Sequence, residues 1–355
     1  MAQPIANLHV RRTVPLPTPG ELEAALPLSD HVRASVLRGR RAIEEMLAGR
    51  DSRLLVIAGP CSIHDERAAL EYAERLAALA EDHNDRLLIT MRVYFEKPRT
   101  TVGWKGMIYD PDLDGSFDIA SGLRRARQLL ITIAGMGLPT ATEFLDPVTP
   151  QYLADLISWT AVGARTTESQ THRQMASGLS MPVGFKNSTD GNIQVAVDAA
   201  LSSREPHAFL GIDVDGRMST VLTKGNPHGH IVLRGGSAGP NYAASHVREV
   251  YDRLERAGLP QQVLVDCSHA NSAKDHRRQA IAFRDVLAQR AAGDRGLIGL
   301  MIESNLFEGR QALGGDPSRL RYGVSITDAC IGWEETVRLV HEAASLRAEP
   351  APARA

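Results

Sequence analysis

Eight short apolar runs are spread along the 355-residue chain, and near-continuous runs of this kind are typical of parallel strands buried on both faces. They span residues 53–61, 86–92, 139–144, 161–165, 181–186, 230–234, 261–269 and 296–303. Amphipathic helical patterns, with apolar residues at intervals of three and four, follow six of these runs. The helical patterns cover residues 66–83, 149–159, 191–203, 245–258, 273–293 and 330–347. The alternation predicts an α/β fold, a TIM (β/α)8 barrel.

Three segments lie outside the minimal barrel, which we expect to occupy residues 51–345 as the catalytic domain. Residues 1–50 contain a proline-rich arm and an amphipathic helical pattern, and predict a regulatory or oligomerisation extension. Residues 207–224 predict an inserted β-hairpin with Asp215-Gly216 at its turn. In the alternative, this hairpin contributes the sixth barrel strand. The Ala/Pro-rich tail, residues 346–355, is expected to be disordered.

Composition narrows the class of protein. The formal net charge is -2, so the chain lacks the basic surplus of a general nucleic-acid binder. It contains no run of about 18 apolar residues, so we expect no membrane partner. Three cysteines, an odd number in a long chain, argue against a secreted disulfide framework. We therefore expect a cytoplasmic protein.

Most of the apolar runs end in residues that carry chemistry, and in a TIM barrel the active site lies at the carboxyl ends of the strands. Six cations are expected at one mouth: Arg92, Lys97, Arg99, Arg165, Lys186 and Arg234. Converging cations repel one another unless an anion binds. Guanidinium groups match phosphate and carboxylate oxygens, and lysine supplies a point charge. The set predicts two phosphorylated substrates, or one phosphate together with a carboxylate.

A metal site is predicted from four residues that are far apart in the sequence. Cys61, His269 and Glu303 end the first, seventh and eighth strands, which are neighbours in a closed barrel, and Asp328 follows the eighth. A thiolate, an imidazole and two carboxylates suit one divalent Mn, Fe, Co or Zn ion rather than Mg or Ca.

Other residues of the same types are interpreted as structural. Cys267 lies on the face of His269 but deeper in the strand, and is expected to pack in the core. His228 and His230 straddle a glycine and are assigned to a loop and a strand start. Cys330 is close in sequence to Asp328, and whether it pairs with Cys61 in a disulfide is left open.

Many of these segments resemble one known family. The motifs are GPCSIHD, MRVYFEKPRTTVGWKG, ATEFLD, GARTTESQ, HIVLRGG, DCSHANS and SITDACIGWE. They are similar to those of the type I 3-deoxy-D-arabino-heptulosonate 7-phosphate (DAHP) synthases, the short microbial feedback-regulated class. The resemblance covers residues 5–345. It implies condensation of phosphoenolpyruvate with erythrose 4-phosphate, the first step of the shikimate pathway to aromatic amino acids, by a homodimer or homotetramer.

The resemblance also implies roles for individual residues. Those expected to bind phosphoenolpyruvate are Arg92, Lys97, Glu143, Arg165, Lys186 and Arg234. Arg99 and Thr100 are expected to receive the erythrose phosphate, and Lys97 to donate a proton to the new alkoxide. Cys61, His269, Glu303 and Asp328 match the family's metal ligands, so Cys61, His269 and Lys97 are the expected catalytic residues. The metal is expected to act as a Lewis acid on the aldehyde.

Feedback regulation by an aromatic amino acid is a further implication of the resemblance. The expected sensor combines the arm, residues 144–151, 175–180 and the hairpin, and its candidate residues are Phe144, Gln151, Met175, Leu179, Ser180, Phe209, Gly211 and Val221. Tyrosine is preferred as effector because Gly211 leaves room for its hydroxyl; phenylalanine is the alternative.

Two rival functions share part of this pattern. One is a sialic-acid or octulosonate synthase, which uses phosphoenolpyruvate with another aldose but lacks the Lys97-Pro98-Arg99-Thr100-Thr101 segment in this form. The other is a non-catalytic sensor of aromatic amino acids or sugar phosphates. A sensor has no need of an open Lewis-acid site, so the metal-ligand set argues against it.

Overall fold

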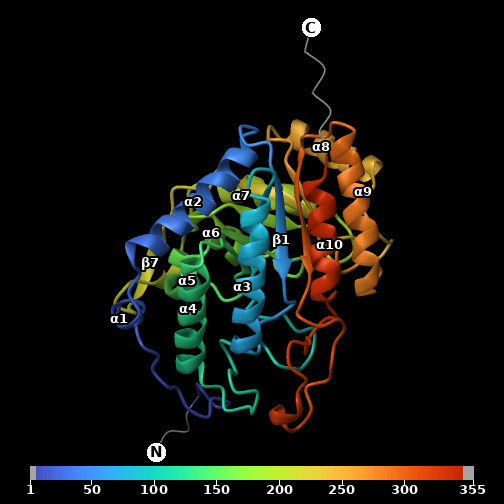
Figure 1. The fold of residues 1–355 in the computed structure, drawn as a ribbon. Helices are drawn as coiled ribbons and strands as arrows, with labels where there is room; N and C mark the ends of the chain where they lie inside the picture. Colours follow the sequence, from blue (N-terminus) through green and yellow to red (C-terminus); the bar gives the residue numbers. More distant parts are fainter. Residues whose placement is uncertain (1–4, 347–355) are drawn as a thin grey trace, which may run out of the picture.

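The computed structural model of the chain describes residues 5–346, so the predicted disordered tail, apart from Leu346, lies outside the described residues. Eight parallel strands close into a barrel in the order β1-β10-β9-β8-β5-β4-β3-β2 (Figure 1). They are β1 (Leu54–Gly59), β2 (Leu87–Arg92), β3 (Thr140–Glu143), β4 (Trp159–Val162), β5 (Val183–Lys186), β8 (Gly229–Leu233), β9 (Val263–Asp266) and β10 (Leu297–Glu303). The predicted TIM barrel is confirmed.

The sixth barrel strand is β8, because β5 pairs in parallel with it from Val183↔Gly229 to Lys186↔Val232. The hairpin forms a separate antiparallel sheet of β6 (Ala208–Ile212) and β7 (Met218–Leu222). The alternative in which the hairpin enters the barrel is therefore wrong.

Helices cover the outside of the barrel. They are α3 (Glu66–Asp82), α4 (Ile119–Gly135), α5 (Pro150–Leu153), α6 (Gln170–Gly178), α7 (Gln194–Arg204), α8 (Ala244–Arg256), α9 (Gln279–Ala291) and α10 (Trp333–Ala344). Short 3-10 turns are η1 (Ala154–Leu156), η2 (His276–Arg278) and η3 (Pro317–Arg319). None of the helices in residues 5–346 has the length and apolar character needed to cross a bilayer.

The sequence patterns missed three helices and misplaced the boundary between one helix and the strand that follows it. α4, α6 and the short α1 (Pro19–Ala25) were not predicted, although α4 buries Leu123, Ala126, Leu130 and Ile133 at helical spacing. The helix predicted over 149–159 is wrong at its end. It stops after one α turn and one 3-10 turn, and Trp159 begins β4.

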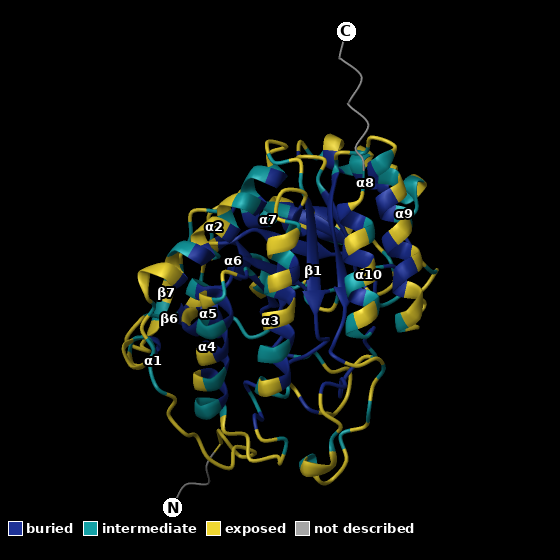
Figure 2. Cartoon of the chain, in the orientation of Figure 1, coloured by how far each residue is buried: buried dark blue, intermediate teal, exposed yellow. Residues whose placement is uncertain are grey.

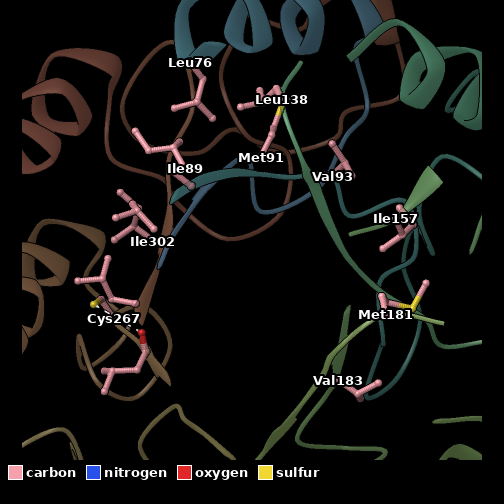
Figure 3. Close-up of a cluster of buried hydrophobic side chains, with 14 of the residues drawn as sticks. Leu76, Ile89, Met91, Val93, Leu138, Ile157, Met181, Val183, Cys267 and Ile302 are labelled. Carbon is pink, nitrogen blue, oxygen red and sulfur yellow. Dashed lines mark hydrogen bonds between the residues drawn. The ribbon is translucent and has the colours of Figure 1, made fainter. Parts of the chain in front are cut away.

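The main core lies between the strands and the surrounding helices, where the outward side chains of the barrel meet the apolar faces of the helices. Figure 3 shows part of this layer, with Leu76 of α3 near Ile89 of β2, and Cys267 among aliphatic side chains. The burial pattern in Figure 2 follows the same division, with the barrel strands almost wholly buried and the helices buried on one side. Cys267 is fully buried in this cluster, as predicted.

Helix α2 (Asp30–Leu47) closes the end of the barrel where the strands begin. Its Ile43 and Met46 join a second cluster with Leu55, Trp159 and other inward-facing strand residues. Ser29 caps the helix through its side-chain oxygen, which accepts from the Val32 N–H. The extension therefore plugs the closed end and leaves the opposite mouth free.

The arm and the hairpin are joined. Helix α1 (Pro19–Ala25) has a capping box between Thr18 and Glu21, and the Gly20 N–H donates to the Val214 carbonyl in the hairpin turn. Gly216 in that turn has φ 74°, a conformation that glycine adopts readily, as the Asp-Gly signal predicts.

Candidate active site

One pocket at the carboxyl ends of the strands gathers nearly all the predicted anion-binding residues. Its lining includes Arg92, Lys97, Arg99, Glu143, Arg165, Lys186, Arg234, His269 and Asp328. These side chains come from segments spread over more than two hundred residues of sequence. The pocket is open to ligands and strongly cationic, as expected for a site that binds phosphate and carboxylate groups.

Arg92 differs from the other cations because most of its donors already have partners. It is 1% exposed, and its guanidinium donates to the carbonyls of Pro60 and Cys61 and, at 2.9 Å, to Glu303 Oε1. Its Cζ lies 3.6 Å from the centroid of the Tyr94 ring. Arg92 thus holds a carboxylate of the candidate metal site as well as lining the pocket.

Three of the four predicted metal ligands form a compact group in the described residues. One ligand atom each from Cys61, Glu303 and Asp328 lies within 4.8 Å of the others. His269 falls outside this group of three, but its Nε2 is 3.9 Å from Glu303 Oε1. Soft sulfur, imidazole and hard carboxylates around one point fit a divalent transition metal.

Electrostatics around the thiol favour a bound cation. Burial and the Glu303 carboxylate raise the pKa of Cys61 to about 11, against the opposing effect of Lys97. Its Sγ lies 3.7 Å from Asp328 Oδ2. Because a divalent ion deprotonates a thiol that it binds, a metal at this point satisfies the buried sulfur and both carboxylates together.

Asp266, which the sequence patterns did not single out, connects the metal group to the anion pocket. This buried carboxylate accepts from Lys186 Nζ at 2.7 Å and lies 3.0 Å from His269 Nδ1. Burial alone would raise the pKa of Asp266, but Lys186 and His269 hold it well below its usual range. A carboxylate on Nδ1 leaves Nε2 of the imidazole to face a metal. The position of Asp266 at the carboxyl end of β9 was the feature of the sequence that could have identified it.

Lys97 reaches into the metal group. Its Nζ lies 3.2 Å from both the carbonyl oxygen and the Sγ of Cys61. Desolvation lowers the pKa of Lys97, but Cys61, Glu303 and Asp328 together raise it above the usual value. The ammonium group therefore carries its proton at neutral pH.

The predicted erythrose-phosphate residues are only partly brought together. Arg99 lines the pocket and its Nε donates to the Trp104 carbonyl at 2.7 Å. Thr100 is exposed and is not among the residues that line the pocket. Residues 100–103 form a bend directly after Arg99, and the role of Thr100 in receiving the erythrose phosphate stays a prediction.

Cys330, His228 and His230 were assigned structural positions from the sequence, and the structure agrees with these assignments. The Cys61 N–H donates to Cys330 Sγ at 3.4 Å, so these residues are neighbours, and both thiols are free. His230 is the second residue of the barrel strand β8 and accepts at Nε2 from the Trp159 indole, while burial lowers its pKa to about 4. His228 lies in the preceding loop.

The predicted regulatory segments are contiguous in space. Phe209, Gly211 and Val221 share one face of the hairpin, and a Cβ on Gly211 would lie 2.7 Å from Val221 Cγ2. Hydrogen bonds join Ser177 to Thr223 and Tyr152 to the Pro17 carbonyl, which link α6 to the hairpin and α5 to the arm. Phe144 and Met175 are buried, Leu179 is half-buried, and Gln151 and Ser180 are exposed.

Glu96 links residues 144–151 to the loop that carries Lys97. The sequence patterns did not single out this residue. Its carboxyl oxygens accept from the N–H groups of Leu145 and Asp146 and from the Tyr109 hydroxyl. Burial raises its pKa to about 7. Because its partners are distant in sequence, no local pattern could reveal them.

Comparisons with known proteins agree with this geometry. The model of the family described as "DAHP synthetase I family" matches residues 30–341. The chain is 56% identical over 336 residues to "Phospho-2-dehydro-3-deoxyheptonate aldolase, Tyr-sensitive" from Salmonella typhimurium, covering 95% of this chain and 94% of that protein. It is 55% identical over 340 residues to the Phe-sensitive protein of Escherichia coli K12, covering 96% of each. It is also 55% identical over 335 residues to the Trp-sensitive protein of Enterobacter agglomerans, covering 94% and 95%.

A solved structure is similar throughout. The phospho-2-dehydro-3-deoxyheptonate aldolase of Francisella tularensis SCHU S4 superposes with a TM-score of 0.92 at 47% identity, covering 95% of this chain and 98% of that one. Its likeness extends over the barrel and the extension alike.

Proposed function

The chain belongs to the DAHP synthetase I family, as its motifs predicted, and on that premise we propose its reaction in full. The enzyme condenses phosphoenolpyruvate with D-erythrose 4-phosphate and water, giving DAHP and inorganic phosphate. The observation that carries the proposal is the single pocket in which Lys97, Arg165, Lys186 and Arg234 converge beside the Cys61 group.

The cationic residues position two anionic substrates. Arg165, Lys186 and Arg234 bind the phosphate and carboxylate of phosphoenolpyruvate, with Arg92 and Glu143 at the edge of the same site. Arg99 receives the phosphate of the aldose. Fixing both reactants in one orientation supplies roughly 7–11 kcal/mol of the barrier reduction in favourable cases.

Carbon 3 of phosphoenolpyruvate attacks the aldehyde carbon, and positive character develops at carbon 2. Water adds at carbon 2, and the resulting phosphohemiketal expels phosphate by cleavage of the C–O bond. The Nζ of Lys97 lies 3.2 Å from Cys61 Sγ, and this position supports Lys97 as the group that donates its proton to the developing alkoxide. Asp266 keeps His269 and Lys186 in their working orientations.

Cys61, His269, Glu303 and Asp328 would hold a divalent Mn, Fe, Co or Zn ion, which would supply Lewis-acid polarisation of the aldehyde when bound. The mixed donor set supports a transition metal. Manganese is the first probe among the four candidate ions.

A phosphate-release assay tests the reaction. The enzyme is treated with chelator, shows no release with both substrates, and recovers activity on addition of Mn²⁺. Release with a different aldose but not with erythrose 4-phosphate would support the rival synthases instead. Binding of either substrate without any release, at every metal tested, would support the non-catalytic sensor.

Tyrosine is the proposed feedback inhibitor. Gly211 lies on the inner face of the hairpin with Phe209 and Val221, where a Cβ would lie 2.7 Å from Val221 Cγ2, so a larger residue at this position would displace Val221. Relatives of nearly equal identity are named Tyr-, Phe- and Trp-sensitive, so all three amino acids are titrated against the initial rate. Inhibition by phenylalanine or tryptophan but not by tyrosine contradicts the assignment.

A homodimer or homotetramer is the proposed assembly, and the cytoplasm the proposed compartment. The outer face of the hairpin exposes Leu210, Met218 and Leu222 at 75%, 73% and 78%, and the arm exposes Ile5 and Leu8. Exposed apolar side chains gathered in this way are typical of a surface that another chain covers.

A further inference from the structure

A cleft of about 700 Å³ lies at the closed end of the barrel, away from the catalytic pocket. Its walls are one side of α2, the last turns of α3, the start of β2 and residues 136–139. It shares no lining residue with the catalytic pocket. Its volume is within the range of about 300–1,000 Å³ that small-molecule sites occupy.

The cleft exists because small residues face one another across it. On α2 the side that lines it carries Ser35, Gly39 and Ala42, spaced at i, i+4 and i+7, and α3 contributes Ala77. α2 touches the barrel closely at Gly39, where a Cβ would lie 2.9 Å from Pro139 Cβ. The contact at Gly39 holds the helix in place, and the small side chains on either side leave the space unfilled.

A buried polar group inside the cleft lacks a partner. Ser35 is 2% exposed, and its hydroxyl makes no hydrogen bond within the described residues. Buried hydroxyl groups are normally satisfied, and leaving one unpaired is unfavourable. A ligand that enters the cleft and presents a polar atom to Ser35 would remove that cost.

The rest of the lining combines an apolar floor with charged side chains of both signs. Arg53 is one of them, and its guanidinium is already paired with Asp51. Leu88 and Leu138 form part of the floor. At the rim lie Arg38 and Glu81, neither of which makes an ion pair or a side-chain hydrogen bond within residues 5–346. A free cation and a free carboxylate beside an apolar floor complement a small zwitterion with an apolar side chain.

We propose that this cleft is a binding site for an α-amino acid with an apolar or aromatic side chain, distinct from both the catalytic pocket and the hairpin. The ligand's carboxylate pairs with Arg38, its ammonium group with Glu81, and its side chain packs on Leu88 and Leu138. The proposal rests on the proposed function only in the choice of aromatic amino acids as the first probes.

Strand β2 connects the cleft to the catalytic mouth. Leu88 in the cleft, Thr90 and Arg92 at the mouth alternate along one face of the strand. Four residues of strand rise separate the two ends by about 13 Å. Because the two sites share no lining residue, a ligand in the cleft does not occupy the substrate positions, and any effect on catalysis is transmitted through the protein.

Binding is tested on the full chain loaded with Mn²⁺. Amide hydrogen exchange is measured with L-phenylalanine, L-tyrosine, L-tryptophan and L-leucine, and with 2-phenylethylamine, which lacks the carboxylate. At least one amino acid should protect residues 34–43 and 86–90. Calorimetry then gives its affinity for three variants: Ala42→Trp, which fills the cleft, Arg38→Ala, which removes the cation, and the control Arg33→Ala, an exposed residue on the opposite side of α2.

The expected pattern is specific. Ala42→Trp abolishes the protection at residues 34–43, Arg38→Ala weakens amino-acid binding roughly tenfold or more, and Arg33→Ala leaves it unchanged. Binding of 2-phenylethylamine does not respond to Arg38→Ala. If Ala42→Trp fails to fold, Arg38→Ala still decides the question.

Protection confined to residues 205–224, or the absence of protection with all four amino acids, overturns the cleft site. Protection at the hairpin alone leaves the proposed feedback inhibitor standing. Failure of the phosphate-release assay leaves the exchange measurement unaffected. Rejection of the cleft site would therefore leave the proposed reaction standing, and rejection of the reaction would leave the cleft site standing.

Discussion

The barrel mouth and the hairpin depart from the usual distribution of polar and apolar groups in opposite directions. At the mouth, Arg92, Lys186 and Glu303 are charged and only 1%, 3% and 2% exposed. On the hairpin, Leu210 and Leu222 are apolar and 75% and 78% exposed. Each arrangement is unfavourable for an isolated folded chain. Buried charges lose their hydration, and exposed apolar side chains stay in contact with water.

The difference shows what each region is built to contact. Buried ion pairs contribute little to net stability, so the charges at the mouth are better explained by the ions that bind there. Lys186 and Asp266 form a buried ion pair at the mouth. Within residues 5–346, the outer face of the hairpin leaves Leu210, Met218 and Leu222 exposed. The charges at the mouth are consistent with the proposed binding of small ions, and the exposed apolar face with the proposed self-association.

Removal of the central sulfur should have the largest effect. Cys61→Ala deletes the ligand that lies closest to Lys97 and Asp328, and we expect the rate of phosphate release to fall at least about 10³-fold, because Lewis-acid activation contributes several kcal/mol. Metal content per chain and the initial rate are measured together. Cys267→Ala, a buried thiol in the aliphatic core, is the matched control and keeps its metal. Full metal content and a full rate in Cys61→Ala would contradict the assignment of Cys61 as a metal ligand.

Replacement of the connecting carboxylate should have an intermediate effect. Asp266→Asn leaves His269 Nδ1 without its carboxylate and Lys186 without its ion pair. We expect metal affinity to fall about 10–100-fold and the KM for phosphoenolpyruvate to rise, while saturating Mn²⁺ restores most of kcat. Metal titration of activity measures both changes. The exposed Asp252→Asn is the control, and an unchanged metal affinity in Asp266→Asn would show that the contact does not orient His269.

The same contrast explains how much the sequence alone could predict. The barrel strands and the residues at the mouth could be predicted from the sequence. Most of the buried strands are apolar runs that end in a charged residue, such as Arg92 or Glu303. The metal group followed from barrel closure, which makes the first and last strands neighbours. Helix α6 was missed because it is short and its buried residues are few.

Residues whose roles depend on distant partners were inaccessible to sequence patterns. Glu96 is one position from Lys97, yet its hydrogen bonds reach Leu145 and Asp146, about 50 residues away. Thr100 likewise does not line the pocket, and the bend formed by residues 100–103 is a property of backbone geometry that the composition of the segment does not reveal.

The buried Glu96 should make the free energy of unfolding depend on pH, and we expect this effect to be smaller than the effect of Cys61→Ala on activity. Burial raises its pKa to about 7, whereas an unfolded glutamate titrates near about 4.3. The folded state therefore disfavours the ionised form, and this destabilisation grows as pH rises from about 4.3 to about 7 and is constant above. We expect Glu96→Gln to remove on the order of 3–4 kcal/mol of this pH dependence over the whole range.

Urea unfolding at pH 5 and pH 7.5 measures the Glu96 contribution, with the exposed Glu74→Gln as control. Parallel pH dependence in the wild type and Glu96→Gln would show that the carboxyl is not desolvated. A matching loss of inhibition by the aromatic effector would add that Glu96 couples residues 144–151 to Lys97.

The smallest effect on the fold, and the most direct test of the contrast, comes from the outer face of the hairpin. Leu222→Asp places a charge on a side chain that is 78% exposed, so the free energy of unfolding of a single chain should change by no more than about 0.5 kcal/mol. If a second copy covers this face, the same substitution buries an unpaired carboxylate in the interface and separates the subunits. Sedimentation of the wild type, Leu222→Asp and the control Ile281→Asp, an exposed position on α9, distinguishes the two cases. An unchanged assembly in Leu222→Asp means that the exposed leucines are not an interface, and the hairpin would then need another explanation for its apolar surface.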